Sequence, residues 1–163
     1  LDMNLVYDVA HNIAKVEKHK VDGEERKLVV HRKGATRAFP SNRAEIPSKY
    51  RDLGQPVLVP GSMGTSSWIL LGKSNSMDLS FGSTAHGAGR TMSRSKARRN
   101  FTEENVKKSL NDKGIFIKAL TRDGVVEETP EAYKDVDSVV NVSHNLGIAT
   151  KVAKLVPIGV IKG

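Results

Sequence analysis

A glycine-rich turn around a single histidine constrains this chain more than any other segment. The stretch runs Phe81-Gly-Ser-Thr-Ala-His-Gly-Ala-Gly-Arg90 and places His86 directly before an alternation of glycine and alanine. Gly87 and Gly89 lack a Cβ atom, so the backbone can adopt φ > 0 and bring N–H groups close to an anion. Arg90 adds a planar fork that suits phosphate oxygens. The pattern is typical of a phosphate-binding loop that carries a nucleophile, and a tight turn with an incidental histidine is the alternative.

The charge of the chain points to polyanionic partners. At 163 residues it is one domain or part of one, and it carries a formal net charge of +8 with a pI near 9.8. The cations gather in residues 31–37 and 90–99, and the second run directly follows the glycine-rich turn. Aromatic residues make up only 5% of the chain, so contacts with a nucleic-acid backbone are favoured over a stacking platform.

Several classes of protein are disfavoured by what the sequence lacks. There are no cysteines, hence no disulfide framework and no thiolate metal site within these residues. No run of about 18 apolar residues occurs, so we expect no membrane span. Together these features favour an intracellular protein. The chain opens at Leu1 without an initiator methionine, which suggests a fragment.

The pattern of apolar residues predicts a mixed α+β fold. Val6, Val9, Ala10, Ile13 and Val16 have helical spacing and predict a helix within residues 6–20. Residues 22–25 predict a hairpin-type turn before a strand at 27–31, and residues 32–55 predict a loop with short elements. Further strands are expected at 55–60, 68–71, 114–120 and 155–161. Helices are expected at 90–99, from a Thr102 cap to 110, at an entry over 127–131, and at 136–147.

A second loop rich in glycine and hydroxyl groups lies between two of the expected strands. It reads Pro60-Gly-Ser-Met-Gly-Thr-Ser-Ser67. Its backbone N–H and side-chain O–H groups could donate to a ligand, and a plain strand-to-strand turn is an equal alternative.

Several long motifs, in the same order along the whole chain, resemble those of the RtcB family of RNA ligases. Within that family, this chain most resembles the archaeal and eukaryotic branch. The motifs lie at residues 7–15, 31–40, 60–65, 81–94 and 157–163. The resemblance implies that residues 1–163 are the carboxyl-terminal portion of a single catalytic domain with mixed β-sheets and flanking helices. It also implies that Gly163 is the natural end and that most metal ligands precede Leu1.

The resemblance implies a mechanism that uses GTP and Mn²⁺. His86 would attack the α-phosphorus of GTP, expel pyrophosphate and become guanylylated. The guanylate would pass to an RNA 3′-phosphate, and attack by a 5′-hydroxyl would join the strands and release GMP. A 2′,3′-cyclic phosphate would first be opened. Neutral imidazole is a competent nucleophile near pH 7, which supports this role independently.

The resemblance also implies roles for individual residues. His11 would ligate manganese and Asn12 would lie at the nucleotide, although hydrogen bonding at a helix cap is the alternative for both. Residues lining the guanosine would be Pro60, Gly61, Ser62, Met63 and Ser67. Residues holding the phosphates would be His86, Gly87, Ala88 and Gly89. Lys162 would contact guanine, where position alone suggests a frayed terminal charge.

Weaker expectations rest on charge and proximity. Arg37, Arg90 and Arg94 are candidates for contacts with RNA phosphates or the guanylate. The remaining histidines, His19, His31 and His144, are expected to be structural or solvated. The family often has cysteine where this chain has Ala85, and tyrosine within the site 66–68. Neither position is the nucleophile or a metal ligand, so we expect the chemistry to survive.

The expected partners follow from the same resemblance. The substrates would be tRNA exon halves or other cleaved RNA, with archease and a larger tRNA ligase assembly as protein partners and no membrane. The compartment would be cytoplasmic, and also nuclear in a eukaryote. Because one histidine cannot hold the metal, the isolated chain is expected neither to ligate nor to self-guanylylate efficiently. A non-catalytic basic RNA-binding module is the alternative.

Overall fold

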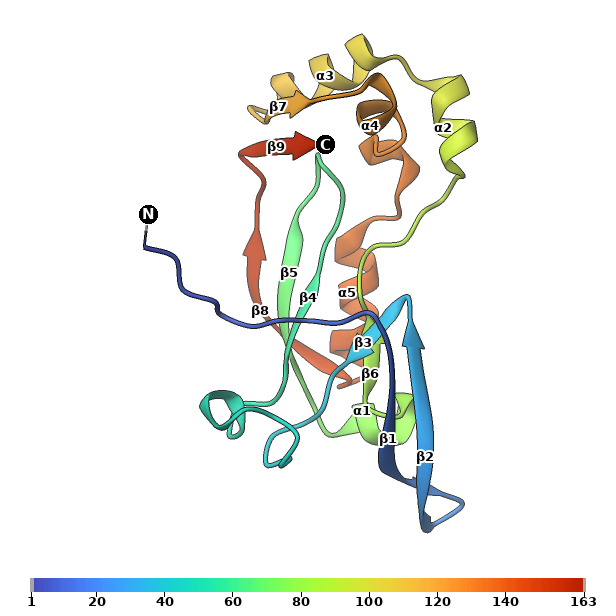
Figure 1. Cartoon of the computed structure of the whole chain (residues 1–163), viewed down its shortest axis with the longest axis vertical. Helices are drawn as coiled ribbons and strands as arrows, with labels where there is room; N and C mark the ends of the chain where they lie inside the picture. Colours follow the sequence, from blue (N-terminus) through green and yellow to red (C-terminus); the bar gives the residue numbers. More distant parts are fainter. Residues whose placement is uncertain (1, 163) are drawn as a thin grey trace.

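The structure is a computed structural model that describes residues 2–162 (Figure 1). Leu1 and Gly163 lie outside the described residues, and so does the expectation about the natural end of the chain. Helices and strands alternate irregularly along the chain, and the strands form small sheets of two or three strands. This arrangement confirms the α+β class. No helix within the described residues is long and apolar enough to cross a bilayer.

A long antiparallel hairpin replaces the helix expected near the amino terminus. β1 (Asn12–Val21) pairs with β2 (Glu24–Lys33) over ten residues, and the described residues before β1 form neither helix nor strand. Asp22 and Gly23 both have positive φ, 53° and 83°, as a two-residue hairpin turn requires, so the turn is confirmed. The prediction of a helix within residues 6–20 is wrong. Its helical spacing was outweighed by backbone pairing with β2, which alternates the side chains between two faces.

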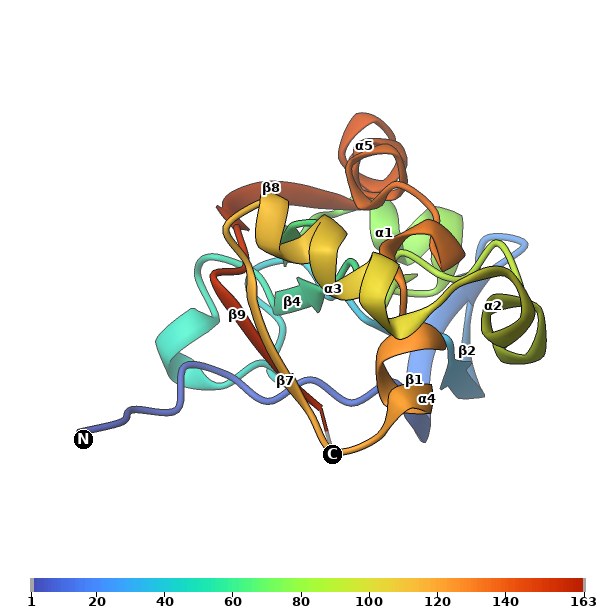
Figure 2. The same cartoon turned by 90° about the horizontal axis from the view of Figure 1, so that it is seen from above.

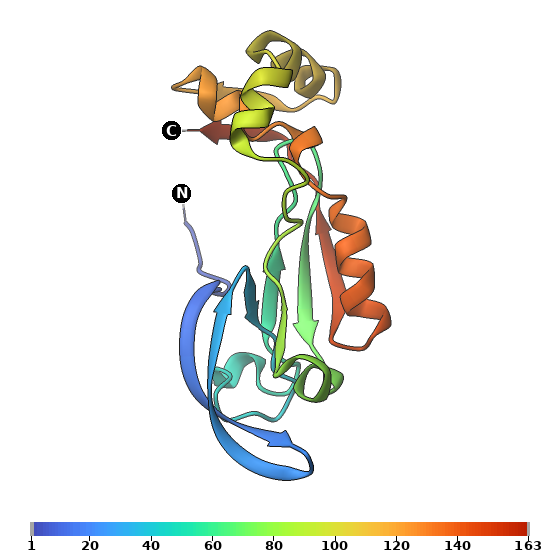
Figure 3. The same cartoon turned by 90° about the vertical axis from the view of Figure 1, so that its right-hand side faces the viewer.

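The central sheet has the order β4-β5-β8 and is antiparallel throughout. Its strands are β4 (Pro56–Val59), β5 (Ser67–Gly72) and β8 (Ala149–Leu155). Helix α5 (Val136–Asn145) lies along one face (Figure 3). Val57, Leu70 and Val140 are buried in the core between them. The strands expected at 55–60 and 68–71 and the helix expected at 136–147 are confirmed within one or two residues.

The single strand expected at 155–161 is wrong. β8 ends at Leu155, and a separate strand, β9 (Gly159–Lys162), joins a different sheet. Pro157 lies between them and has no N–H to donate to a ladder. The break redirects the end of the chain toward the loop of residues 60–67.

A helical layer sits at one end of the molecule (Figure 1) and faces the viewer when the molecule is seen from above (Figure 2). It contains α2 (Arg94–Asn100), α3 (Glu103–Asp112), α4 (Arg122–Val126) and β7 (Phe116–Ala119), which pairs in parallel with β9. The Thr102 hydroxyl accepts a hydrogen bond from Asn105 N, so the expected cap is confirmed. Met63, from the loop of residues 60–67, is buried in this layer with Val106 and Leu110.

Two helix boundaries in this layer differ from expectation. The basic helix begins at Arg94, because the Ser93 side chain caps it, and not at residue 90. The helix entry expected at 127–131 is also wrong, since α4 ends at Val126 and a 3-10 turn, η2 (Pro130–Ala132), follows. A second 3-10 turn, η1 (Ser48–Tyr50), lies in the loop region of residues 32–55.

A two-stranded sheet connects the hairpin to the glycine-rich turn. β3 (Ala35–Arg37) follows β2 and pairs antiparallel with β6 (Ser83–Ala85). A short helix that the sequence did not indicate, α1 (Asn75–Ser80), precedes β6. Between them, Phe81 and Gly82 both have positive φ, and a Cβ on Gly82 would lie 2.3 Å from Phe39 Cε1. Glycine is therefore required at this turn.

Candidate active site

β6 delivers His86 to one end of the two-stranded sheet. Ala85, the last residue of β6, pairs with Ala35 of β3, and His86 follows directly. His11 arrives by a different route, because it immediately precedes β1. The Thr36 hydroxyl of β3 donates a 2.8 Å hydrogen bond to the carbonyl oxygen of Ala10. β3 therefore holds both histidine-bearing segments.

The His11 and His86 rings stack. Their centroids are 4.6 Å apart and their planes differ by 13°. The pKa of His86 is lowered from its usual value of 6.5, first by burial and second by repulsion from the charge that His11 can carry. A lowered pKa keeps the imidazole neutral at pH 7, and only the neutral ring has a free lone pair to attack an electrophile or bind a metal.

The glycine-rich turn continues from His86 against the loop of residues 60–67. Ala88 N donates a 2.9 Å hydrogen bond to the carbonyl oxygen of Pro60. A Cβ on Gly87 would lie 3.3 Å from that same oxygen, and Gly89 has a φ of 74°. The close approach favours glycine at residue 87, and the positive φ favours glycine at residue 89.

The loop of residues 60–67 and the end of the chain share a polar pocket of about 380 Å³. The side of the pocket formed by the loop consists of Pro60, Gly61, Ser62, Met63 and Ser67. The opposite side is formed by residues 159–162 of β9, including Lys162. Every residue expected to line the guanosine therefore lies at one pocket, although the sequence places Lys162 far from the loop.

Two further pocket residues were missed by sequence reasoning. Glu128 and Tyr133 line the same pocket. The Tyr133 hydroxyl donates to a carboxylate oxygen of Glu128. Burial alone would raise the pKa of Glu128, but this hydrogen bond and the nearby charges of Lys162 and Arg90 outweigh burial and lower it. The only sequence signal was the scarcity of aromatic residues, which makes a tyrosine in a polar segment notable.

Arg90 is engaged inside the protein. Its guanidinium donates to the Tyr133 hydroxyl at 3.1 Å and to the carbonyl oxygen of Glu127 at 2.6 Å, and it lies 4.9 Å from the centre of the Tyr133 ring. It also lies 3.4 Å from Glu128 Oε1. Arg90 therefore orients the two pocket residues that the sequence did not reveal. Arg94, on α2, has a side chain that is 66% exposed, and its Nε lies 3.4 Å from Glu127 Oε2 and 3.5 Å from Glu128 Oε1.

The other predicted residues lie around this centre or apart from it. Asn12 Oδ1 is 3.5 Å from His31 Nε2, at the start of β1. Arg37 donates to Gln55 Oε1 at 3.1 Å and lies 4.8 Å from the centre of the Phe39 ring, so its contacts are within the fold. Of the remaining histidines, His19 is buried, and His31 and His144 are exposed.

The departures at 66–68 are explained by alternation along β5. Ser66 Oγ and Trp68 Nε1 donate to Asp137 Oδ1 of α5 at 3.3 and 2.6 Å, while Ser67 lines the pocket. Only every second residue of a strand faces a given side, so Trp68 fastens α5 to the sheet and does not enter the pocket.

The described residues do not form a metal site by themselves. Among residues 2–162, no three or more histidine, cysteine, aspartate or glutamate side chains are grouped to hold a metal ion. Imidazole nitrogen is a ligand that divalent transition metals accept, so His11 fits such a role. A complete coordination shell would need ligands beyond these residues.

Comparison with known proteins points to one family. A family model described as tRNA-splicing ligase RtcB matches residues 1–163. The chain is 53% identical to the tRNA-splicing ligase RtcB of Nanoarchaeum equitans, 57% to that of Archaeoglobus fulgidus and 58% to that of Aeropyrum pernix. Each comparison covers 100% of this chain and 34% of the relative, so the chain spans about a third of the length of these curated relatives.

Proposed function

The chain belongs to the RtcB family of tRNA-splicing ligases, and from this premise we propose that it carries the nucleophile and the guanosine pocket of a GTP-dependent RNA ligase. The reaction would join an RNA 3′-phosphate or 2′,3′-cyclic phosphate to a 5′-hydroxyl, as in the joining of tRNA exons. The activity would belong to a family-length protein. The 163-residue chain would form the carboxyl-terminal part of its catalytic domain and would be inactive alone.

One observation carries the proposal: the turn that begins at His86 is hydrogen-bonded to the loop of residues 60–67, and that loop lines a pocket. The pKa of His86 is lowered, and the turn that follows His86 is hydrogen-bonded to Pro60 at the pocket. A nucleotide base in the pocket could thus extend its phosphates toward His86. Nucleophilic attack needs this combination of a free lone pair and a substrate held in reach.

In the proposed first step, an imidazole nitrogen of His86 forms a bond to the α-phosphorus of GTP. The bond to pyrophosphate breaks, and the guanylate remains on the ring. An RNA 3′-phosphate oxygen then attacks the same phosphorus and releases the ring. Backbone N–H groups of the turn from His86 to Gly89 would face the phosphate oxygens. Attack by the 5′-hydroxyl would complete the join and release GMP.

The pocket residues would recognise the base. The Lys162 ammonium can donate to a carbonyl oxygen, which guanine has and adenine lacks at the same ring position. The Tyr133 ring gives a planar apolar face against which a purine could pack. Glu128 and Arg90 would hold that ring in place through the contacts described above.

His11 would bind Mn²⁺, with the remaining ligands supplied from outside the described residues. When bound, the metal would neutralise charge on the phosphates. This chain's own contribution is to hold His11 against β3 and to keep His86 neutral beside it.

RNA would approach over α2, which carries four cationic residues, Arg94, Lys96, Arg98 and Arg99. The net charge of +8 and the exposed Arg94 support contacts with phosphates. Arg90 would contribute by orienting the pocket. Association with archease or a tRNA ligase assembly, and an intracellular location, stay expectations.

The test is to incubate a family-length protein containing this chain with GTP and Mn²⁺ and to weigh it intact. We expect a gain of one guanylate, mapped to His86 by peptide analysis and abolished in His86→Ala. His144→Ala is the matched control, because His144 is exposed on α5. An adduct that persists in His86→Ala would mean another nucleophile. Salt-dependent RNA binding without any adduct would favour a non-catalytic RNA-binding module.

A further inference from the structure

The hairpin β1–β2 buries charge on its inner face and exposes valine on its outer face. The side chains of Glu17 on β1 and Arg32 on β2 are 3% and 1% exposed, whereas Val16 and Val29 are 68% and 72% exposed. Charged residues are almost never fully buried unless they are paired. Buried charge and exposed valine reverse the usual pattern of a hairpin. We therefore expect Glu17 and Arg32 to do something that apolar side chains could not.

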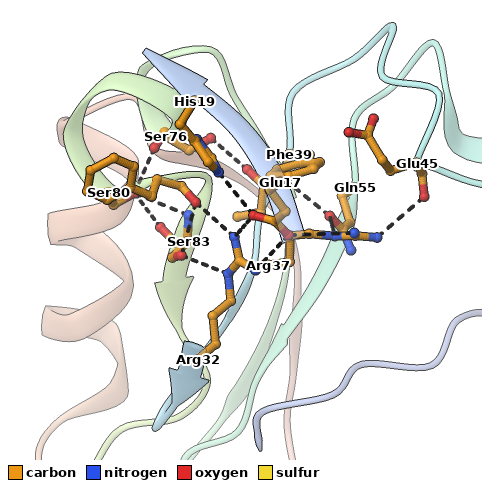
Figure 4. Close-up of polar contacts among 12 residues, drawn as sticks. Glu17, His19, Arg32, Arg37, Phe39, Glu45, Gln55, Ser76, Ser80 and Ser83 are labelled. Carbon is orange, nitrogen blue, oxygen red and sulfur yellow. Dashed lines mark hydrogen bonds and ion pairs between the residues drawn. The ribbon is translucent and has the colours of Figure 1, made fainter. Parts of the chain in front are cut away.

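Arg32 and Glu17 form a two-pronged ion pair (Figure 4). Arg32 Nη1 donates to Glu17 Oε1 at 2.9 Å, and Arg32 Nη2 donates to Glu17 Oε2 at 2.8 Å. His19 Nε2 lies 3.0 Å from the same Oε2 atom. Both oxygens of the carboxylate are thus engaged, which fixes the plane of the guanidinium.

The rest of the guanidinium reaches the segment that leads to His86. Arg32 Nε donates to Ser83 Oγ at 2.8 Å, and Nη2 donates to the carbonyl oxygen of Phe81 at 2.8 Å. Ser83 is the first residue of β6, and Phe81 has a φ of 49°, a conformation that residues other than glycine seldom adopt. Arg32 therefore holds a strained turn at the start of the strand that delivers His86.

Through Arg32, the ion pair connects β1 to β6, the two strands that flank the histidines: Glu17 lies six positions after His11, and Ser83 lies three positions before His86. β1 starts directly after His11, and β6 ends directly before His86. β2 also continues into β3, which pairs with β6. A buried ion pair is weak evidence for stability, because desolvation offsets much of the attraction. Its directional contacts are better suited to fixing where two segments lie relative to each other.

We propose that Arg32, oriented by Glu17, is a positioning residue that sets the separation of the His11 and His86 rings. The expected effect on the rate of His86 guanylylation rests on the proposed function. The expected effect on the separation of the two rings does not depend on the proposed function. Displacement of a reacting group by about 1 Å can cost about a hundredfold in rate.

The decisive variant is the double substitution Arg32→Met with Glu17→Leu. It removes both charges of the pair together. The Ser83 hydroxyl loses its donor, the Phe81 carbonyl keeps only its 3.3 Å hydrogen bond from Ser83 Oγ, and His19 Nε2 loses its Glu17 partner. Arg32→Lys keeps the charge and loses the fork. The matched control is Lys18→Met with Glu25→Leu, which removes an exposed ion pair of 2.8 Å from the same hairpin without touching β6.

In a family-length protein at saturating GTP and Mn²⁺, we expect the double variant and Arg32→Lys to form the His86 guanylate about tenfold to a hundredfold more slowly. The KM for GTP should stay within about threefold, because the pocket itself is untouched. The control should match the wild type. A purely structural role would instead lower the amount of folded protein and leave the rate per folded molecule unchanged.

Crystal structures of the same variants provide a readout that is independent of activity. The wild-type ring centroids are 4.6 Å apart and the ring planes differ by 13°. In the double variant we expect a different centroid distance or a loss of the near-parallel stacking. A wild type that takes up no guanylate would refute the proposed function, while the ring separation would still decide the positioning role. Unchanged rates and unchanged rings in a folded variant would overturn it. If the double variant does not fold, Ser83→Ala, which removes one acceptor of Arg32, is judged by the same two measurements.

Discussion

The rings of His11 and His86 lie parallel, 4.6 Å between centroids, although they are far apart in the sequence. Two rings this close cannot both be protonated without repulsion, and His86 is also partly withdrawn from solvent. The arrangement favours a neutral His86 at pH 7.

The titration of His86 should reflect this arrangement. Its pKa is lowered below 6.5, first by burial and second by His11, so the ring should stay neutral at a lower pH than a solvated histidine. His11→Phe removes the repelling charge and should raise the pKa of His86, though burial should still hold it below 6.5. NMR titration of the metal-free protein would measure this, with the exposed His144→Phe as control. A wild-type midpoint at or above 6.5 would contradict the prediction.

Lys162→Met should weaken GTP binding about tenfold or more, because a hydrogen bond from a charged donor is lost while the apolar stem is kept. Discrimination against ATP should also fall. Calorimetric titration with both nucleotides would measure the two effects. Lys118→Met is the control, since Lys118 lies on the neighbouring strand β7 but faces solvent. Equal losses in the two variants would point to charge alone and not to the pocket.

Gly61→Ala should disrupt the pocket without unfolding the protein. A Cβ at this position would lie 2.2 Å from Ser66 O and 2.5 Å from Thr65 Oγ1, so the loop of residues 60–67 must shift. GTP binding should fall sharply, while the melting temperature changes by only a few degrees, about the effect of a typical loop substitution. Gly23→Asn, in the hairpin turn with no atom within 4 Å of the added Cβ, should leave GTP binding unchanged. Normal GTP affinity in Gly61→Ala would separate the loop from the nucleotide.

Arg94→Ala should weaken RNA binding and reduce its salt dependence. Each lost phosphate contact lowers the slope of log K against log salt by about one. Binding of a 3′-phosphate RNA across a salt series would test this. Arg94 Nε also lies 3.4 Å from Glu127 Oε2 and 3.5 Å from the pocket residue Glu128, so the rate of guanylate formation is measured on the same variant to separate an effect on the pocket from an effect on RNA binding. Arg26→Ala is the control, because Arg26 belongs to β2 of the hairpin, and the hairpin lies at the opposite end of the molecule from α2 (Figure 1). An unchanged slope would exclude a phosphate contact by Arg94.

Much of the local structure was predictable because neighbouring residues decide it. The Asp22-Gly23 turn and the Thr102 cap depend on groups within three or four positions, and both are present as predicted. The first segment was mispredicted for the opposite reason. Residues 12–21 form a strand because of pairing with β2, and Val6 lies outside any helix, where its carbonyl oxygen accepts a hydrogen bond from the Tyr50 hydroxyl. The spacing of apolar residues indicates neither the pairing with β2 nor the contact with Tyr50.

The site divides in the same way. The glycine-rich turn was predictable because the local backbone favours glycine at residues 87 and 89. Tyr133 and Glu128 belong to no local sequence pattern, so their place at the pocket was not predictable. Arg90 shows how charge alone misleads. It belongs to a basic run, yet its guanidinium is engaged by Tyr133 and the Glu127 carbonyl, and this depends on how α4 packs beside α2.

The sequence by itself determined the family of this chain, the glycine turn that holds His86, and the positive charge available for phosphates. These properties depend on residue types and short spacings. Only the tertiary structure decided that His11 stacks on His86, that Lys162 closes the pocket opposite Pro60, and that Glu17 and Arg32 are buried together. Each of these contacts joins segments that are not neighbours in the sequence, and such contacts form only when the packing of the whole core offsets the entropy of closing the chain between them.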